Sequence, residues 1–220
     1  MNNTSIALRP GALLAPQLDY ILFDGSYSMR SKWWQSCGAL DAFISVLRER
    51  NINSHCILSV FDDNNLGAIQ RDCILRDWAA FGDQPLLGTF GSTPLYDAIN
   101  KMGWELRDLQ PPSASIVIVT DGEENASQFT TLEQAKAILD WCRAQGWQVT
   151  FLGADFENNR QARALGARAE CAIGVRQQKL LEAGKALGAK RASHALHGTD
   201  INFSQEEKEN FGGYLTGPSK

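Results

Sequence analysis

The sequence predicts an α/β protein with a Rossmann-like open, mainly parallel sheet and helices on both faces. Short apolar runs rich in β-branched and aromatic residues alternate along the chain with longer amphipathic segments. Two of these runs, residues 18–24 and 115–120, lead into an aspartate followed by glycine. Repeated strand–helix alternation is typical of a parallel sheet covered by helices on both sides.

Length and charge bound the organisation of the chain and its partners. The 220 residues predict an N-terminal arm (1–17), one domain (18–198) and a polar C-terminal tail (199–220). The net charge of −4 and the pI near 5.4 do not indicate a phosphate-binding surface, so we expect no nucleic-acid partner. No apolar run approaches the ~20 residues that span a bilayer, so we expect no membrane partner.

Cysteine usage and the first residues predict the compartment. The five cysteines are an odd number, are widely spread and form no Cys-x-x-Cys pair, which favours buried thiols in a reducing environment. Residues 1–16 show no basic segment followed by an apolar core, so we expect no signal peptide. The sequence therefore predicts a cytoplasmic protein.

The first half of the chain begins with the strand that ends at Asp24. Ser31 is a candidate N-cap for the next helix, and the adjacent Trp33 and Trp34 require at least one indole to face away from the core. Asp and Asn in residues 62–67 favour a hairpin turn over a calcium loop, because position twelve of such a loop is Cys73. We expect, in order, a helix at 31–50, a strand at 55–61 and an antiparallel edge strand at 68–75.

The second half repeats strand and helix. Pro94 favours a helix start, and Gly146 marks the end of a later helix. We expect helices at 94–109, 131–145 and 155–165, and strands at 115–120, 147–152 and 169–173. A last helix at 175–197 is expected to be interrupted by Gly184 and Gly188. Its basic residues, including Arg191, are expected to form a solvated outer face, and a surface for nucleic acid or an acidic partner is the alternative.

Oxygen-bearing side chains follow the two strands that end in aspartate. Asp24, Ser26 and Ser28 alternate just beyond the first strand, and Asp121 follows the central one. Ligand crevices of open parallel sheets lie outside the carboxyl ends of the strands, and clustered oxygens suit a hard cation. A capping turn explains the first stretch equally well, because Asp and Ser also favour strand-to-helix turns.

A third segment adds Thr93, presented at a loop end before Pro94. Asp-x-Ser-x-Ser at 24, 26 and 28, then Thr93, then Asp121, resembles the metal-ion-dependent adhesion site of the von Willebrand factor A domain. The resemblance covers about residues 18–175 and implies that family's fold, with one antiparallel edge strand. It also implies a Mg²⁺ site, with Mn²⁺ or Ca²⁺ as substitutes, in which Ser26, Ser28 and Thr93 are direct ligands. Asp24 and Asp121 would act through water.

The resemblance implies a binding module rather than an enzyme. Mg²⁺ held by neutral hydroxyls attracts a Glu or Asp carboxylate from a partner protein, and intracellular relatives often work beside AAA+ ATPases or in stress-response complexes. Glu123 and Glu124 are expected to add negative potential. The alternative is a Mg²⁺-dependent hydrolase acting on phosphate esters at the same site. The stretch at 23–26 also resembles haloacid-dehalogenase phosphatases, but Leu22 stands where that family has its nucleophilic aspartate.

Overall fold

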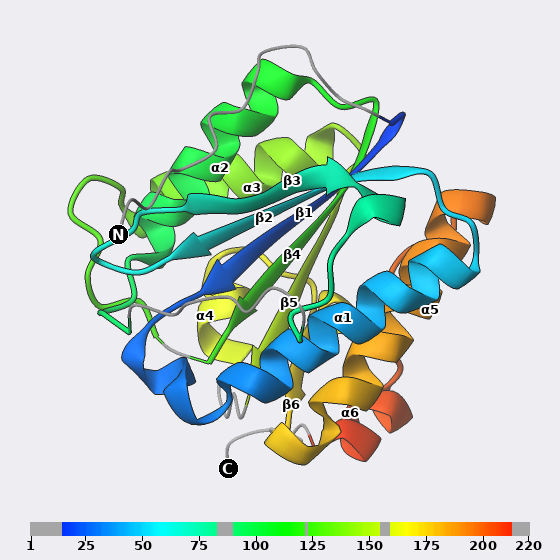
Figure 1. Ribbon diagram of the computed structural model, residues 1–220. Helices are drawn as coiled ribbons and strands as arrows, with labels where there is room; N and C mark the ends of the chain where they lie inside the picture. The colour runs from blue at the N-terminus through cyan, green and yellow to red at the C-terminus, as the bar shows by residue number, and fades with distance from the viewer. Residues whose placement is uncertain (1–14, 83–89, 122, 155–158, 213–220) are drawn as a thin grey trace.

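A six-stranded sheet forms the centre of the molecule (Figure 1). The computed structural model describes residues 15–82, 90–121, 123–154 and 159–212. The strands lie in the order β3-β2-β1-β4-β5-β6, and every neighbouring pair is parallel except β2 with β3. Their bounds are β1 Gln17–Asp24, β2 Ser54–Phe61, β3 Ala68–Ile74, β4 Ser113–Thr120, β5 Gln148–Ala154 and β6 Ala172–Val175. The predicted parallel α/β sheet with one antiparallel edge strand is confirmed.

Helices cover both faces of this sheet. Their bounds are α1 Trp33–Glu49, α2 Leu95–Leu109, α3 Leu132–Ala144, α4 Asn159–Ala164, α5 Leu180–His197 and α6 Gln205–Phe211. The predicted starts of several elements shift by a few residues. The largest shift is in the last helix, because Arg176 is extended and residues 177–179 form a short 3₁₀ turn before α5.

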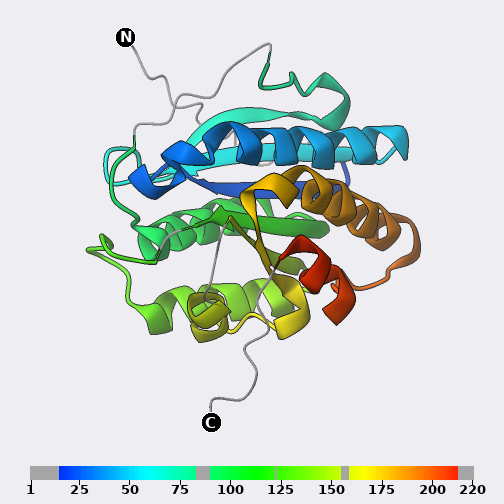
Figure 2. The same ribbon diagram turned by 90° about the horizontal axis from the view of Figure 1, so that it is seen from below.

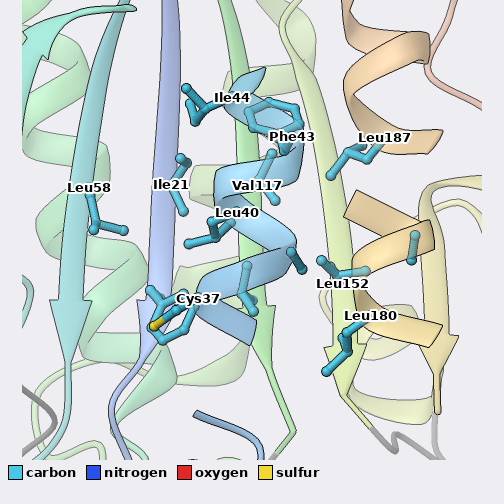
Figure 3. Packing of buried hydrophobic residues seen from close by; sticks show 14 of the residues in the cluster. Ile21, Cys37, Leu40, Phe43, Ile44, Leu58, Val117, Leu152, Leu180 and Leu187 are labelled. Atoms are coloured by element: carbon cyan, nitrogen blue, oxygen red, sulfur yellow. The ribbon is translucent and has the colours of Figure 1, made fainter. Parts of the chain in front are cut away.

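Two apolar layers follow from the alternation of side chains along β1. Ile21 and Phe23 face α1 and α5, whereas Tyr20 and Leu22 face α2 and α3. Figure 3 shows the first layer, in which Leu40 and Phe43 of α1 lie over the sheet. Because β1 is buried on both faces, its residues 20–23 form a continuous apolar run.

Helices α1 and α5 run side by side on one face (Figure 2). The glycines that were expected to interrupt α5 face the backbone of α1. A Cβ on Gly184 would lie 2.1 Å from the Ala39 carbonyl oxygen, and one on Gly188 would lie 2.9 Å from the Phe43 carbonyl oxygen. The helix is continuous from Leu180 to His197, and the glycines allow α1 to pack closely against it.

Arg191 of α5 is wrongly placed by the sequence prediction. Its side chain is fully buried rather than solvated, and its Nε donates to Asp19 Oδ1 of β1 at 2.7 Å. Ser54 donates to the other oxygen of Asp19. A buried guanidinium requires such a partner, and the pair ties α5 to the centre of the sheet.

The described residues after 198 also pack on the domain. Ile201, Phe203 and Phe211 are buried in the layer that α1 and α5 cover. Ser204 caps α6 through a capping box with Glu207. The division of the chain at residue 198 stays a prediction. No helix among the described residues is long and apolar enough to cross a membrane.

Candidate metal centre

The candidate centre lies at the carboxyl ends of β1 and β4, the two central strands. These strands are parallel neighbours, with Phe23 opposite Val119. Asp24 ends β1, and Asp121 follows the last residue of β4. The arrows of β1, β2 and β4 in Figure 1 point to this same edge of the sheet. Asp24 and Asp121 therefore stand at the ends of two neighbouring strands.

A chain of hydrogen bonds joins these two strand ends. Ser26 Oγ lies 3.0 Å from Ser28 Oγ, and Ser28 Oγ donates to Asp121 Oδ1 at 2.6 Å. A serine hydroxyl has one proton. Because Ser28 donates its proton to Asp121, it accepts the hydrogen bond from Ser26. Asp24 Oδ1 accepts from the Ser26 backbone N–H at 2.8 Å, which closes the turn after β1. Four of the five predicted site residues therefore form one connected cluster.

Asp24 is the innermost residue of this cluster and is fully buried. Its side chain is inaccessible to solvent, and the Thr120 hydroxyl donates to its Oδ2 at 2.6 Å. Burial raises the pKa of Asp24 to about 6, and the nearby charge of Asp121 acts in the same direction. Hydrogen bonds from Thr120 and Ser26 oppose that rise. Thr120 was not singled out from the sequence, where it appears as the last residue of an apolar strand.

Thr93 reaches this edge on a loop tied to both strand ends. The Phe90 N–H donates to the Gly25 carbonyl at 3.0 Å, and the Tyr27 N–H donates to the Gly91 carbonyl at 2.8 Å. Thr93 itself is buried, and its backbone exchanges two bonds with Asn125. Its contacts with the segment after β1 thus run through the backbone of the residues before it.

The loop after β4 is held by carboxylates with a structural role. Glu124 accepts hydrogen bonds from the backbone N–H groups of Tyr96, Ala126 and Ser127. Glu124 therefore holds the loop that carries Asn125 in place. This structural role is additional to the negative potential expected of Glu124 from the sequence. Glu123 lies nearby and is exposed. No pattern in the sequence indicates this role, because it depends on the position of α2.

The turn after β2 confirms the hairpin interpretation of residues 62–67. Asp62 Oδ1 accepts from the backbone N–H groups of Asn64 and Asn65, at 2.9 and 2.7 Å. Asp63 accepts from the Ser92 N–H at 2.9 Å, which joins this turn to the Thr93 loop. Gly67 has a φ of +66°, a conformation that suits glycine at the end of the turn.

Lys32 is the main feature of the centre that the sequence prediction missed. Its Nζ lies 2.6 Å from Asp121 Oδ2. Ser31, the predicted N-cap, ends a short 3₁₀ turn (Tyr27–Ser31), and Lys32 takes the cap position of α1 without a side-chain cap bond. A lysine one helical turn beyond Ser28 is the only trace of this contact in the sequence.

The donors of the cluster suit a hard cation. Its side chains offer hydroxyl and carboxylate oxygens, and Mg²⁺ prefers such ligands. Within the described ranges, no group of three or more His, Cys, Asp or Glu side chains is arranged to hold a metal ion. A cation at this edge would therefore depend on the serine hydroxyls as well as on the carboxylates. Direct ligation by Ser26, Ser28 and Thr93 stays a prediction.

Comparisons with known proteins identify the fold. No protein-family model matches the chain. No curated protein matches it either. Among solved structures, the von Willebrand factor domain of the type V pilus tip protein Mfa5 from Porphyromonas gingivalis has a TM-score of 0.62 at 10% identity. That match covers 89% of this chain and 100% of the other.

Two further structures show the same likeness over part of a larger protein. The pilus adhesin SpaC from Lactobacillus rhamnosus GG has a TM-score of 0.61 at 11% identity, covering 83% of this chain and 31% of SpaC. A von Willebrand factor type A protein from Catenulispora acidiphila has a TM-score of 0.58 at 16% identity, covering 80% of this chain and 43% of the other. The chain thus spans less than half the length of these two proteins. Its six-stranded, mostly parallel sheet with the antiparallel edge β3 and helices on both faces has the fold of the von Willebrand factor A domain.

Proposed function

We propose that this protein is a Mg²⁺-dependent interaction module that binds an acidic side chain of a partner protein. The observation that carries the proposal is the chain of hydrogen bonds from Ser26 through Ser28 to Asp121, which joins the ends of β1 and β4. Ser28 directs its proton to Asp121 and accepts from Ser26, so one lone pair of its oxygen remains for a cation. The fold supports the proposal, because similar domains occur in pilus tip proteins and adhesins.

The chemistry of the partner follows from the charge of the donors. Neutral serine and threonine hydroxyls leave the charge of Mg²⁺ poorly compensated, and the ion exchanges its water reluctantly. A partner carboxylate supplies the missing negative charge. Ser28 and Tyr27 are exposed at this edge, so a partner can approach it. An AAA+ ATPase or a stress-response complex is the proposed setting.

The proposal places the protein in the cytoplasm and assigns it no catalytic role. All five cysteines are free thiols, which supports a reducing compartment. Each strongly buried thiol has its pKa raised by burial, so none is a reactive thiolate. The Ser28 hydroxyl, which donates to the Asp121 carboxylate, and the other oxygen-bearing residues of the centre are assigned to holding the cation rather than to nucleophilic catalysis.

The first test is Mg²⁺ binding by calorimetry, with Ser28→Ala and Ser31→Ala as a matched pair. Both serines lie in the same 3₁₀ turn and both are exposed, but the Ser28 hydroxyl belongs to the cluster. Wild type and Ser31→Ala are expected to bind one Mg²⁺ each. Ser28→Ala is expected to lose at least tenfold in affinity, since even indirect ligand partners contribute ~10–100-fold. Equal affinity in Ser28→Ala would exclude the proposed site.

The second test separates binding from catalysis. Affinity capture is performed with Mg²⁺ and repeated with EDTA, and captured proteins are re-tested as purified components with Glu and Asp changed to Gln and Asn. Binding that needs both Mg²⁺ and a partner carboxylate is expected. Mg²⁺-dependent turnover of p-nitrophenyl phosphate or its bis ester, absent in Ser28→Ala, would instead support the hydrolase alternative.

A further inference from the structure

Lys32 places a positive charge inside the candidate metal centre. Its ammonium lies 2.6 Å from Asp121 Oδ2, and the two residues are 89 positions apart in the sequence. The lysine side chain is only 16% exposed, and the Asp121 side chain is fully buried. Charges in such a position are less screened by salt and water than a pair on the surface.

The two carboxylates of the centre accept hydrogen bonds from different kinds of donor. Asp24 accepts hydrogen bonds from a backbone N–H and from the Thr120 hydroxyl, which are neutral donors. Asp121 accepts from the Ser28 hydroxyl at Oδ1 and from the charged Lys32 ammonium at Oδ2. Both oxygens of Asp121 are therefore engaged by the segment that follows β1. The negative charge that would attract a cation to this side of the centre is already balanced.

We propose that Lys32 is an internal cation that competes with a divalent cation for Asp121. A metal ion that draws on Asp121, directly or through water, must displace the ammonium or share the carboxylate with it. Sharing brings like charges together, and displacement breaks a charge-assisted hydrogen bond. Lys32 therefore lowers the affinity of the centre and sets the Mg²⁺ concentration at which it fills. This inference rests on the proposed metal-binding function.

The chain offers a control lysine with the same kind of bond elsewhere. Lys136 on α3 pairs with Asp140 at 2.6 Å, but both side chains are about half exposed. Lys32→Met and Lys136→Met change the net charge of the protein equally. They differ in whether the lost ammonium faces Asp121.

The test is calorimetric titration of the full chain with MgCl₂ at one pH and one ionic strength. Lys32→Met is expected to bind Mg²⁺ about tenfold more tightly than wild type, the lower end of the effect of a neighbouring charge on an ionic equilibrium. Lys136→Met is expected to match wild type. Equal or weaker binding by Lys32→Met overturns the inference. Absence of Mg²⁺ binding in wild type and both variants overturns the proposed function itself.

A second measurement uses wild type and does not depend on the folding of a variant. Acetylation of each lysine by a soluble N-hydroxysuccinimide ester is followed by mass spectrometry, with and without saturating Mg²⁺. Release of the ammonium from Asp121 is expected to raise the acetylation rate of Lys32 several-fold, and the rate of Lys136 is expected to stay constant. An unchanged Lys32 rate at a Mg²⁺ concentration that saturates the centre by calorimetry contradicts displacement.

Discussion

At the scale of single residues, the centre is organised by where each proton goes. Ser28 donates to Asp121, Ser26 donates to Ser28, and Thr120 donates to Asp24. These assignments leave the carboxylates as acceptors and the outer faces of the serine oxygens for a cation. The Thr120 hydroxyl thus donates to the buried Asp24, and the Ser28 hydroxyl donates to Asp121.

Thr120→Val tests the role of the hydroxyl that serves Asp24. Valine keeps the shape of the side chain but leaves a fully buried carboxylate without one of its donors. Hydrogen bonds to charged groups contribute about 1.5–3 kcal/mol, so the free energy of unfolding in urea is expected to fall by that amount.

Thr150→Val is the matched control for Thr120→Val. Thr150 is a buried threonine of β5, and its hydroxyl has no hydrogen-bond partner within the described part of the chain. Its replacement by valine is expected to be neutral or stabilising, because no bond is lost. A similar loss in both variants would mean that the change of side chain, and not the bond to Asp24, determines the effect at Thr120.

Local sequence signals identified part of the centre. Asp24, Ser26, Ser28 and Asp121 could be found because they directly follow recognisable strands, where side chains of parallel neighbours meet. Lys32 could not be assigned, because a lysine near a helix start is usually solvated. Its contact depends on how far the 3₁₀ turn after β1 carries it toward β4, and no local pattern encodes that distance.

At the scale of elements, the packing of α1 on α5 determines the shape of one face. The sequence predicted both helices, but the two glycines of α5 were interpreted as interruptions of the helix. Glycine lowers helix propensity, so it predicts a break. Here a side chain at Gly184 would overlap the backbone of α1, so the absence of a Cβ allows the contact. A partner helix is needed to distinguish these two roles.

Gly184→Ala tests this contact against an ordinary helix effect. The added methyl group would lie 2.1 Å from the Ala39 carbonyl oxygen, a backbone atom that cannot move alone. We expect the free energy of unfolding to fall by about 1–3 kcal/mol, despite the better helix propensity of alanine.

Gly38→Ala on α1 is the control for this substitution. A Cβ at Gly38 would meet nothing within 4 Å. Propensity alone is therefore expected to raise the free energy of unfolding by about 0.5–1 kcal/mol. Chemical denaturation of both variants decides between the two roles of glycine, since a stabilised Gly184→Ala protein would contradict the close contact of α1 with α5.

Arg191 shows why the sequence predicted a solvated position for a residue of α5 that is buried against the sheet. The helix carries several basic residues and one acid, a composition that is typical of a solvated face. The acid that pairs with Arg191 is Asp19, which lies 172 positions earlier in an apolar strand. Charge patterning within one helix cannot indicate such a partner.

At the scale of the whole molecule, the described residues after α5 complete one face of the domain. Lys190 of α5 lies 5.0 Å from the centre of the Phe203 ring and 2.9 Å from the Glu207 carboxylate. The Phe203 N–H donates to the Glu170 carbonyl, and the Arg176 N–H donates to the Phe211 carbonyl. The segment was expected to be a polar tail because most of its residues are polar. Its few apolar residues are the ones that pack against the core.

A pair of truncated chains tests the contribution of this segment. Chains ending at residue 212 and at residue 198 differ only in residues 199–212, which include Ile201, Phe203 and Phe211. Each of these buried side chains is worth about 1.5–3 kcal/mol, a sum that is a large part of the ~5–15 kcal/mol stability of a typical domain. Chain 1–198 is therefore expected to melt at a much lower temperature than chain 1–212, or to be recovered only as aggregate. The loss of residues 199–212 uncovers the apolar layer beside β6 and α5.

The comparison uses thermal melting by circular dichroism and size-exclusion chromatography at equal concentration. Equal melting temperatures for the two chains would show that residues 18–198 form the complete folding unit and that the segment after it is dispensable for stability.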